Sequence, residues 1–215
     1  GSLAVKPYLS DGCSVGDVQV YVESLDGKRL SKPVCETDAD VIRTLIKGVS
    51  PWSHEHPVLY RLVAELYEKG RIIHRVTENI GFRTVEFREH DGIYLNGERI
   101  VFKGVNRHCF WPESGRTLSR SVSLMDAELI KSMNMNAVRM SHYPPDKEFL
   151  EICDSIGLLV IDELCGWQKR YDTSVARPLV RSVVERDRNH PSVILWANGN
   201  EGGWNREVDE DYSVY

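Results

Sequence analysis

Near its end the chain carries the stretch that decides the fold: Val193-Ile194-Leu195-Trp196-Ala197-Asn198-Gly199-Asn200-Glu201. Its opening apolar run follows Asn189-His190-Pro191 and has the character of a strand buried on both faces. In an α/β barrel, the residues just past such a strand form the rim of the active site. We therefore expect Glu201 on that rim, where a carboxyl group acts as a catalytic acid.

From about residue 100 the sequence alternates between strand and helix patterns. Strands are predicted at residues 100–105, 137–140, 158–161 and 193–196. The first helix is predicted from a capping box and from apolar residues at helical spacing: Ser123 with Asp126, then Met125, Leu129, Ile130 and Met133. The second helix is predicted to follow Pro144-Pro145 and to end at Gly157, and its inward residues are Phe149, Leu150, Ile152, Cys153 and Ile156. The third helix carries Leu179, Val180, Val183 and Val184. This alternation predicts a parallel sheet with crossover helices.

The first part of the chain has a different pattern, of short alternating runs separated by turn signals. This pattern is typical of an antiparallel β-sandwich, and the turn spacing suits an immunoglobulin-like module. A hairpin is predicted between residues 60–67 and 72–76, and Val85-Glu86-Phe87 is assigned to the same sandwich. Asn96-Gly97 predicts a further hairpin.

The predicted fold class is therefore multidomain, all-β plus α/β. We expect an immunoglobulin-like β-sandwich at residues 1–90 and the first half of a (β/α)8 TIM barrel at residues 91–215. An eight-stranded barrel takes roughly 250 residues, far more than remain after the sandwich. We therefore expect the chain to be a fragment of a longer protein.

Composition narrows the possible partners. The chain has 215 residues, 41% of them hydrophobic and 27% charged, and a formal net charge of -5. This balance argues against nucleic-acid binding, which depends on clustered Lys and Arg, and no apolar stretch is long enough to suggest a membrane span. Five cysteines without close pairs argue against a disulfide framework or a zinc site. Compartment and oligomeric state stay open, although a homo-oligomer of the full-length protein is possible.

Polar residues follow all four predicted barrel strands. They are Asn106-Arg107-His108, then Arg139 with Ser141-His142-Tyr143-Pro144, then Asp162-Glu163, then Asn200-Glu201. With Lys103-Gly104-Val105 before the first group and Arg186-Asp187-Arg188-Asn189-His190-Pro191 before the last strand, the chain resembles glycoside hydrolase family 2. The resemblance is strongest to the β-galactosidase branch and implies a retaining β-glycosidase that acts on terminal β-linked sugars of oligosaccharides or other glycosides.

The resemblance also implies roles for individual residues. Glu201 is the expected general acid and base, and Asn200 the expected partner of the sugar hydroxyl beside the reacting carbon. His108 and His142 resemble a pair of sugar-contacting histidines, expected as hydrogen-bond donors. Arg139 is expected to pair with the nucleophilic carboxylate, or to form a structural ion pair. Glu163 is expected either to order the site or to hold a loop in place. Trp204 is the preferred aromatic platform for a sugar, and Trp196 is a weaker candidate.

Two departures from the family pattern bear on cofactors and chemistry. Magnesium-dependent members carry a Glu and a His after the Asp-Glu pair, whereas this chain has Leu164-Cys165-Gly166-Trp167-Gln168-Lys169. Magnesium prefers hard oxygen ligands, so we expect no metal site and no other cofactor. The family nucleophile is a second Glu late in the barrel, and no residue of this chain matches its motif. The chain alone is therefore expected to be inactive.

Three alternatives remain open. The chain could be a non-catalytic carbohydrate-binding or scaffold module that has lost its chemistry. It could belong to a hydrolase of another class in which Glu163 is the partner carboxylate of Glu201. Within the resemblance, β-glucuronidase or β-mannosidase specificity is the alternative to β-galactosidase.

Overall fold

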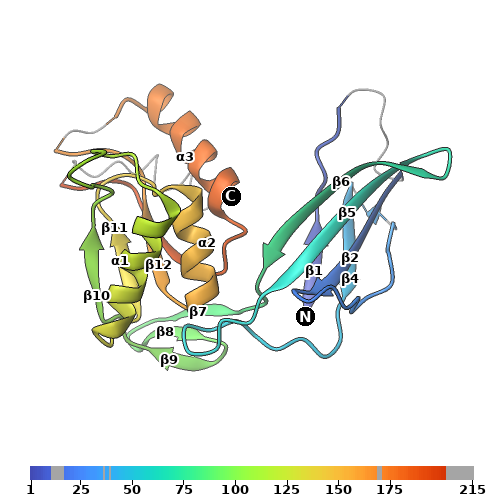
Figure 1. Ribbon diagram of the computed structural model, residues 1–215, viewed down its shortest axis with the longest axis horizontal. Coiled ribbons are helices and arrows are strands. Elements are labelled where there is room, and N and C mark those ends of the chain that lie inside the picture. The colour runs from blue at the N-terminus through green and yellow to red at the C-terminus, as the bar shows by residue number, and fades with distance from the viewer. Residues whose placement is uncertain (11–16, 36, 39, 169–170, 202–215) are drawn as a thin grey trace. The chain divides into compact units, whose positions relative to one another are not determined.

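The computed structural model describes residues 1–10, 17–35, 37–38, 40–168 and 171–201. The chain forms two compact units (Figure 1). The first unit comprises Gly1–Trp52 and Val58–Phe82, and the second comprises Ser53–Pro57 and the chain from Arg83 onward. The expected domain limits, 1–90 and 91–215, stay a prediction.

The first unit is a sandwich of two antiparallel sheets. One sheet has the order β1 (Ser2–Val5), β4 (Val41–Leu45), β3 (Thr37–Asp38), and the other has the order β2 (Val18–Ser24), β5 (Tyr60–Glu68), β6 (Arg71–Ile80). Val18 and Val20 of β2 pack with Ile42 of β4 to form a core between the sheets. The predicted immunoglobulin-like sandwich is confirmed, as is the hairpin of β5 and β6.

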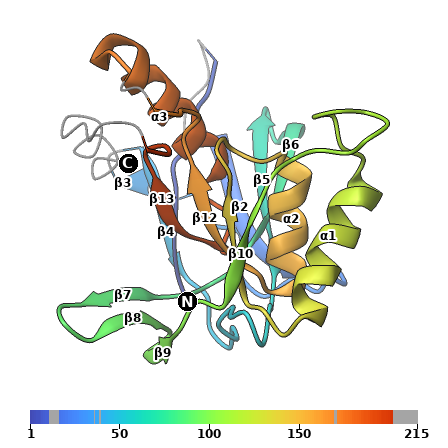
Figure 2. The ribbon, with the colours of Figure 1, turned by 90° about the vertical axis from the view of Figure 1, so that its left-hand side faces the viewer.

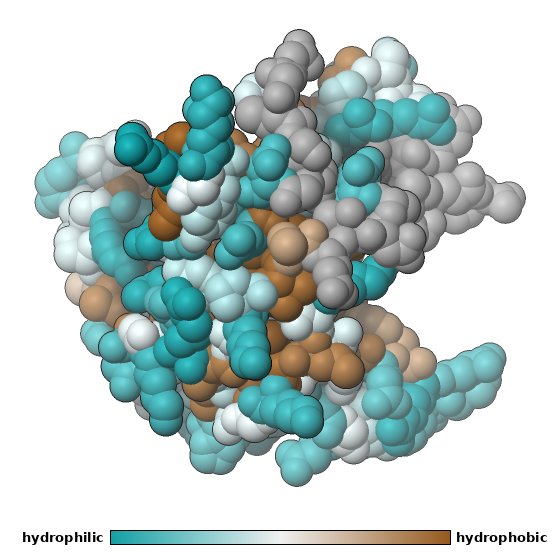
Figure 3. Space-filling view, turned by 90° about the vertical axis from the view of Figure 1, so that its right-hand side faces the viewer, coloured by the Kyte–Doolittle hydropathy of each residue, from teal (hydrophilic) through white to brown (hydrophobic). Residues whose placement is uncertain are grey.

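The surface of the molecule is mixed in character. Figure 3 shows one face, on which hydrophobic side chains lie among hydrophilic ones. In the first unit, the exposed hydrophobic residues include Leu45 on β4 and Ile72, Ile73 and Val76 on β6. Exposed apolar side chains are common on protein surfaces.

A small separate sheet opens the second unit. It consists of β7 (Val85–Arg88), β8 (Gly92–Leu95) and β9 (Glu98–Ile100), in that order. The assignment of Val85-Glu86-Phe87 to the sandwich is therefore wrong, because β7 pairs with its sequence neighbour β8 rather than with a sandwich strand. The Asn96-Gly97 hairpin is confirmed, and both turn residues have positive φ, as a type I′ turn requires.

The predicted parallel sheet is confirmed. Its order is β10 (Gly104–Arg107), β11 (Ala137–Met140), β12 (Leu159–Glu163), β13 (Val193–Ala197), so that each strand pairs with the next along the chain. This is the start of a barrel. The first strand begins later than predicted, because Ile100 ends β9 and the parallel ladder starts at Gly104. A Cβ atom at Gly104 would lie 2.2 Å from the carbonyl oxygen of Ala137, so only glycine permits this approach of β10 to β11.

Three helices join the strands: α1 (Arg120–Ser132), α2 (Lys147–Ile156) and α3 (Thr173–Asp187). Figures 1 and 2 show α1 and α2 side by side over one face of the sheet. Their buried residues form one core with Val138 and Met140 of β11 and Val160 of β12. The predicted inward residues of α2 lie in or against this core, and α2 ends at Gly157 in the left-handed conformation, as predicted.

Helix α1 begins earlier in the sequence than predicted and buries a different face. Its N-cap is Ser119, whose side chain accepts from the Val122 N–H, so the proposed capping box at Ser123 is wrong. Ser123, Ala127 and Ile130 form the buried stripe. Three of the apolar residues expected to form this stripe are exposed: Met125, Leu129 and Met133. Small residues on the neighbouring stripe allow closer packing, a preference that apolar periodicity alone does not reveal.

No helix in the described residues is long and apolar enough to cross a membrane. Four cysteines lie in the described parts of the chain, and all four are free thiols. Cys109 and Cys153 are buried, Cys165 is half-buried and Cys35 is exposed. Cys13 lies outside the described residues.

Candidate active site

The parallel sheet brings residues from distant parts of the sequence to one edge. His108 follows β10, Ser141-His142-Tyr143 follows β11, Cys165-Gly166-Trp167 follows β12, and Asn200 follows β13. Because all four strands are parallel, their carboxyl ends meet at the same edge of the sheet. The polar residues singled out in the sequence therefore gather there.

Strand alternation separates the core residues from the site residues. Val138 and Met140 of β11 point toward the helices and lie in their core. Arg139 lies between them in sequence and so points to the other face of the sheet. Glu163 of β12 shares the face of Arg139, because Arg139 pairs with Ile161 and Glu163 is two residues further along. That face becomes the interior of a closed barrel.

Glu163 is the centre of a buried ionic network. Its carboxylate is fully buried; Arg139 Nε donates to Oε2 at 2.6 Å, and His142 Nδ1 lies 2.9 Å from Oε1. Of the two expectations for Arg139, the structural ion pair is the one present in the described residues. Glu163 thus contacts both an arginine and a histidine at the strand ends, and its expected role in ordering the site stays a prediction.

Arg139 also orients Asn200. Its Nη2 group donates to Asn200 Oδ1 at 3.0 Å. The backbone of Asn200 is held as well: its N–H donates to the Gly166 carbonyl at 3.1 Å, and its carbonyl accepts from the Gln168 N–H at 3.0 Å. Since arginine only donates, the amide oxygen of Asn200 faces Arg139 and the amide NH2 is left as the donor for a ligand.

The two histidines have different hydrogen-bonding partners. The Tyr143 hydroxyl accepts from the Cys109 N–H at 3.1 Å and lies 3.4 Å from His108 Nδ1. A hydroxyl can donate to that nitrogen or accept from it, so both tautomers of His108 fit this contact. The Nδ1 atom of His142 faces the Glu163 carboxylate, which only accepts, so in neutral His142 the proton is on Nδ1 and Nε2 is an acceptor. The expectation that both histidines donate to a sugar stays a prediction.

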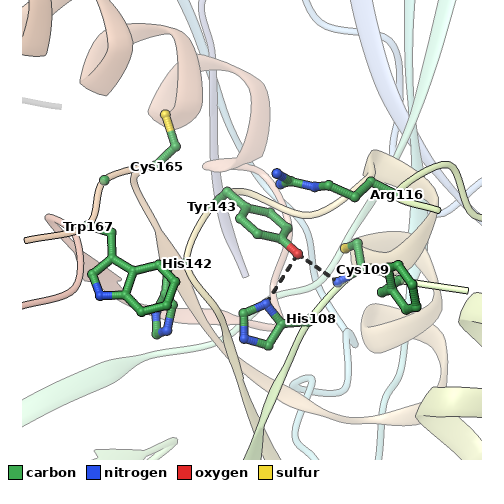
Figure 4. A pocket seen from close by; sticks show the side chains of 9 residues that line it. His108, Cys109, Arg116, His142, Tyr143, Cys165 and Trp167 are labelled. Carbon is green, nitrogen blue, oxygen red and sulfur yellow. Dashed lines mark hydrogen bonds between the residues drawn. The ribbon is translucent and has the colours of Figure 1, made fainter.

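A cavity of about 650 Å³ opens beside the histidines (Figure 4). Its lining comes from the ends of β10, β11 and β12 and from the loop before α1: His108, Cys109, Phe110, Arg116, His142, Tyr143, Cys165, Gly166 and Trp167. The rings of His108 and His142 lie edge to face with centroids 5.4 Å apart, and Trp167 lies 5.4 Å from His142. A volume of this size is within the range of small-molecule sites.

Glu201 lies at the same edge, directly after Asn200. It is exposed, and its φ of 49° is a left-handed value that residues other than glycine rarely adopt. Strained backbone of this kind is concentrated at functional sites. The Glu201 side chain makes no hydrogen bond or ion pair within the described residues. Trp204, the predicted aromatic platform, lies outside them.

Asp162 points away from this site, toward the helices. It is fully buried, and burial together with the neighbouring Asp187 carboxylate raises its pKa to about 8. Asp187 is itself paired with Arg186. Trp196 shares the face of Asp162 and packs against both helical cores, so it is a core residue rather than a sugar platform.

Magnesium does not fit the described part of this site. The residues after Glu163 that the structure describes, 164–168, contain no carboxylate, and Glu163 is occupied by Arg139 and His142. Across the described ranges, no group of three His, Cys, Asp or Glu side chains is placed to hold a metal ion. Lys169 lies outside these ranges.

Several cavity residues were missed by sequence reasoning. Tyr143, Arg116, Phe110 and Trp167 lie in loops, where no periodic pattern marks them. Of these residues, Tyr143 was the easiest to predict, because it directly follows His142 in the sequence. Trp167 is 61% exposed, and its ring lies beside that of His142, so it is an aromatic surface at this site that the sequence did not single out.

Family models match nearly the whole chain. Residues 5–83 match the model described as glycosyl hydrolases family 2, and residues 85–215 match the family 2 TIM barrel domain. A curated β-galactosidase from Halalkalibacterium halodurans is 41% identical over 209 residues, covering 86% of this chain and 20% of the relative. The chain spans about a fifth of the length of the first curated relatives it matches.

Solved structures agree with the family models. A β-glycosidase from Bacteroides vulgatus has a TM-score of 0.79 at 27% identity, over 90% of this chain and 26% of that one. A β-glucuronidase from Ruminococcus gnavus has a TM-score of 0.79 at 25% identity, over 92% of this chain and 36% of that one.

Proposed function

Since the chain belongs to glycosyl hydrolases family 2, we propose that it forms part of a retaining β-glycosidase in which Glu201 is the general acid and base. The substrate is a terminal β-linked sugar of an oligosaccharide or other glycoside. Asn200, His108 and His142 bind that sugar, and Arg139 and Glu163 position them.

The hydrogen bond from Arg139 to Asn200 is the observation that carries this proposal. It ties the residue before Glu201 to a buried network from two other strands. A hydrogen bond to the hydroxyl next to the reacting carbon strengthens as the transition state acquires oxocarbenium character. The amide oxygen of Asn200 already accepts from Arg139, and no described residue accepts from its NH2 group, so this group is a suitable donor for that bond.

The chemistry requires two carboxyl groups. One protonates the leaving oxygen and later deprotonates water, and the other attacks the anomeric carbon from about 5 to 5.5 Å away. Glu201 takes the first role. Glu163 is a poor candidate for the second, because its carboxylate is fully buried and both oxygens are bound. We place the nucleophile in a part of the protein beyond these residues.

A β-galactoside is the substrate to test first. A β-galactosidase relative is 41% identical over 209 residues, and a putative β-glucuronidase from Formosa agariphila is 40% identical over a shorter stretch of 163 residues. Both kinds of protein support a β-glycosidase. The choice between their sugars is a separate question from the acid-base role of Glu201.

Glu201→Gln in the full-length protein tests the acid-base role. A dinitrophenyl group leaves without protonation, whereas a sugar alkoxide does not. The variant should therefore lose about 100- to 10,000-fold in kcat/KM on a disaccharide and far less in the glycosylation step with a dinitrophenyl glycoside. The glycosyl-enzyme should accumulate, and azide should restore turnover because it attacks without a base.

Two results would contradict the proposal. Equal losses on both substrates without azide rescue would make Glu201 the nucleophile or a structural residue. Normal sugar binding with no hydrolysis by the full-length wild-type protein would instead favour the non-catalytic carbohydrate-binding module. Glu185→Gln on the exposed face of α3 is the control, with activity unchanged.

A further inference from the structure

We infer that Arg116 recognises an anionic group on the substrate, a carboxylate or a sulfate ester. This inference rests on the proposed function, because it takes a β-glycoside to bind at His108 and His142. It adds a property that the acid-base chemistry does not require, namely a preference for negatively charged glycosides.

The first argument is the position of Arg116. Its side chain lines the same cavity as His108 and His142, although it comes from the loop before α1 (Figure 4). Its guanidinium carbon lies 3.8 Å from the centre of the Tyr143 ring. Stacking on a tyrosine whose hydroxyl is already engaged holds the cation in one place. Binding of a ligand then costs less side-chain entropy, because the stacked arginine has fewer rotamers to lose than a free one.

The second argument is the missing counter-charge. Neighbouring arginines have protein partners: Arg107 pairs with Asp126, and Arg120 pairs with Glu151. Within the described residues, Arg116 has neither an ion pair nor a hydrogen bond to an acceptor. Its five N–H donors are therefore open to a planar or tetrahedral oxyanion, which a guanidinium binds through paired hydrogen bonds.

The third argument is the charge of the cavity as a whole. None of its lining residues is acidic. The nearest carboxylate of the network, Glu163, is buried and neutralised by Arg139. Burial raises the pKa of the Cys109 thiol, so this group adds no negative charge either. An anion that enters the cavity meets positive charge and donors without repulsion from the lining.

The test is binding to the 215-residue chain, measured by ligand-observed NMR titration. The neutral probe is methyl β-galactoside, and its anionic counterparts carry a carboxylate or a sulfate at C6. Phenyl and 4-carboxyphenyl β-galactoside place the charge on the leaving-group side instead. We expect at least one anionic probe to bind about five- to tenfold more tightly than its neutral parent, as a partly exposed charged hydrogen bond would give. The probe that does so identifies the anion and its position.

Arg116→Gln should abolish this preference and leave the affinity for the neutral probes within twofold. Arg116→Lys should keep most of it, because the positive charge remains. Arg120→Gln is the matched control: Arg120 is a nearby exposed arginine on α1, not a cavity residue, and its loss should change neither affinity. Thermal unfolding of each variant establishes that it is folded.

The outcomes separate this inference from the proposed function. Equal binding of neutral and anionic probes would overturn the role of Arg116 and leave the glycosidase proposal standing. A preference that survives Arg116→Gln would assign the anion to another group and also overturn it. Failure of every probe to bind at the cavity would count against both. Tighter binding of inorganic sulfate than of any glycoside would show a free-anion site rather than substrate recognition.

Discussion

Glu163 is the residue on which the site geometry depends most. A fully buried carboxylate holds Arg139 and His142, and Arg139 in turn holds Asn200. These side chains come from three strand ends: Arg139 and His142 from β11 and the loop after it, Glu163 from β12, and Asn200 from the segment after β13. The network is therefore a positioning device, and loss of its central charge should disturb all three partners together.

Glu163→Gln should lower the free energy of unfolding by about 3 kcal/mol, because it leaves the partly buried Arg139 cation without its counter-charge. Urea denaturation of the 215-residue chain measures this. Glu185→Gln, on the exposed face of α3, should change stability by less than about 0.5 kcal/mol. A loss for Glu163→Gln no larger than for this control would show that the ion pair contributes nothing to the fold.

Asp162 should make stability depend on pH. Burial and Asp187 raise its folded pKa to about 8, from an ordinary value of 3.8. The folded state thus retains a proton that the unfolded chain releases, so this contribution to stability is full below about pH 4 and is lost as the pH rises toward 8. The loss should reach up to about 1.4 kcal/mol per pH unit. Denaturation at a series of pH values measures the slope.

Asp162→Asn should flatten that slope, since the amide cannot ionise, and should make the protein more stable than wild type near pH 8. Asp172→Asn at the N-cap of α3 is the control, because Asp172 is exposed and asparagine caps helices about as well as aspartate. An unchanged pH profile in Asp162→Asn would show that Asp162 is ionised in the folded state.

At the scale of elements, the C-terminal end of α2 packs closely against the rest of the second unit at Gly157. Gly157 has a φ of 78°, and a Cβ atom there would lie 2.3 Å from the carbonyl oxygen of His54. The Lys131 ammonium of α1 donates to the carbonyls of both His54 and Gly157 at 3.1 Å. The ends of the two helices and the 53–57 segment therefore meet at this point.

Gly157→Ala should destabilise the chain by about 3 kcal/mol or more, since it adds a backbone clash to the strain of a left-handed alanine. Gly97→Ala separates the two effects. Gly97 also has a positive φ, 83°, but nothing lies within 4 Å of the position that a Cβ atom would take there. Its substitution should cost only about 1 to 2 kcal/mol. Similar losses for the two variants in thermal or urea unfolding would mean that the clash is relieved by a backbone shift.

For the molecule as a whole, the parallel sheet supplies one carboxyl partner of a two-carboxyl mechanism. We expect no measurable hydrolysis of aryl β-galactosides by residues 1–215 alone and turnover by the full-length protein, measured by release of nitrophenol. The chain carrying Glu201→Gln gives the background rate. Turnover by the wild-type chain well above that background would show that a local pair, such as Glu163 and Glu201, suffices, and the assignment of roles would then be wrong.

Local patterns in the sequence were enough to predict the fold class and the order of strands and helices in the parallel sheet. Alternating runs predicted the sandwich, and strand-helix alternation predicted the parallel sheet, because side-chain periodicity directly reflects which face of an element is buried. The positions of His108, His142, Glu163 and Asn200 after their strands followed from the same reasoning. Two predictions were wrong. Val85-Glu86-Phe87 has the alternation of a sandwich strand but pairs with the strand that follows it in sequence. Helix α1 buries Ser123 and Ala127 with Ile130, and small residues of this kind do not stand out in a pattern of large apolar residues.

Only the tertiary structure decided how these residues contact one another. Glu163 binds both Arg139 and His142, Tyr143 lies within reach of His108, and Arg116 lines the cavity. All three contacts depend on distances between separate strands and loops. Sequence spacing is blind to such distances, because loops carry no periodicity and hydrogen-bond partners are chosen by geometry in three dimensions. The sequence by itself determined which chemical groups reach the edge of the sheet, and the packing of the strands determined which of them hold each other and which stay open to a ligand.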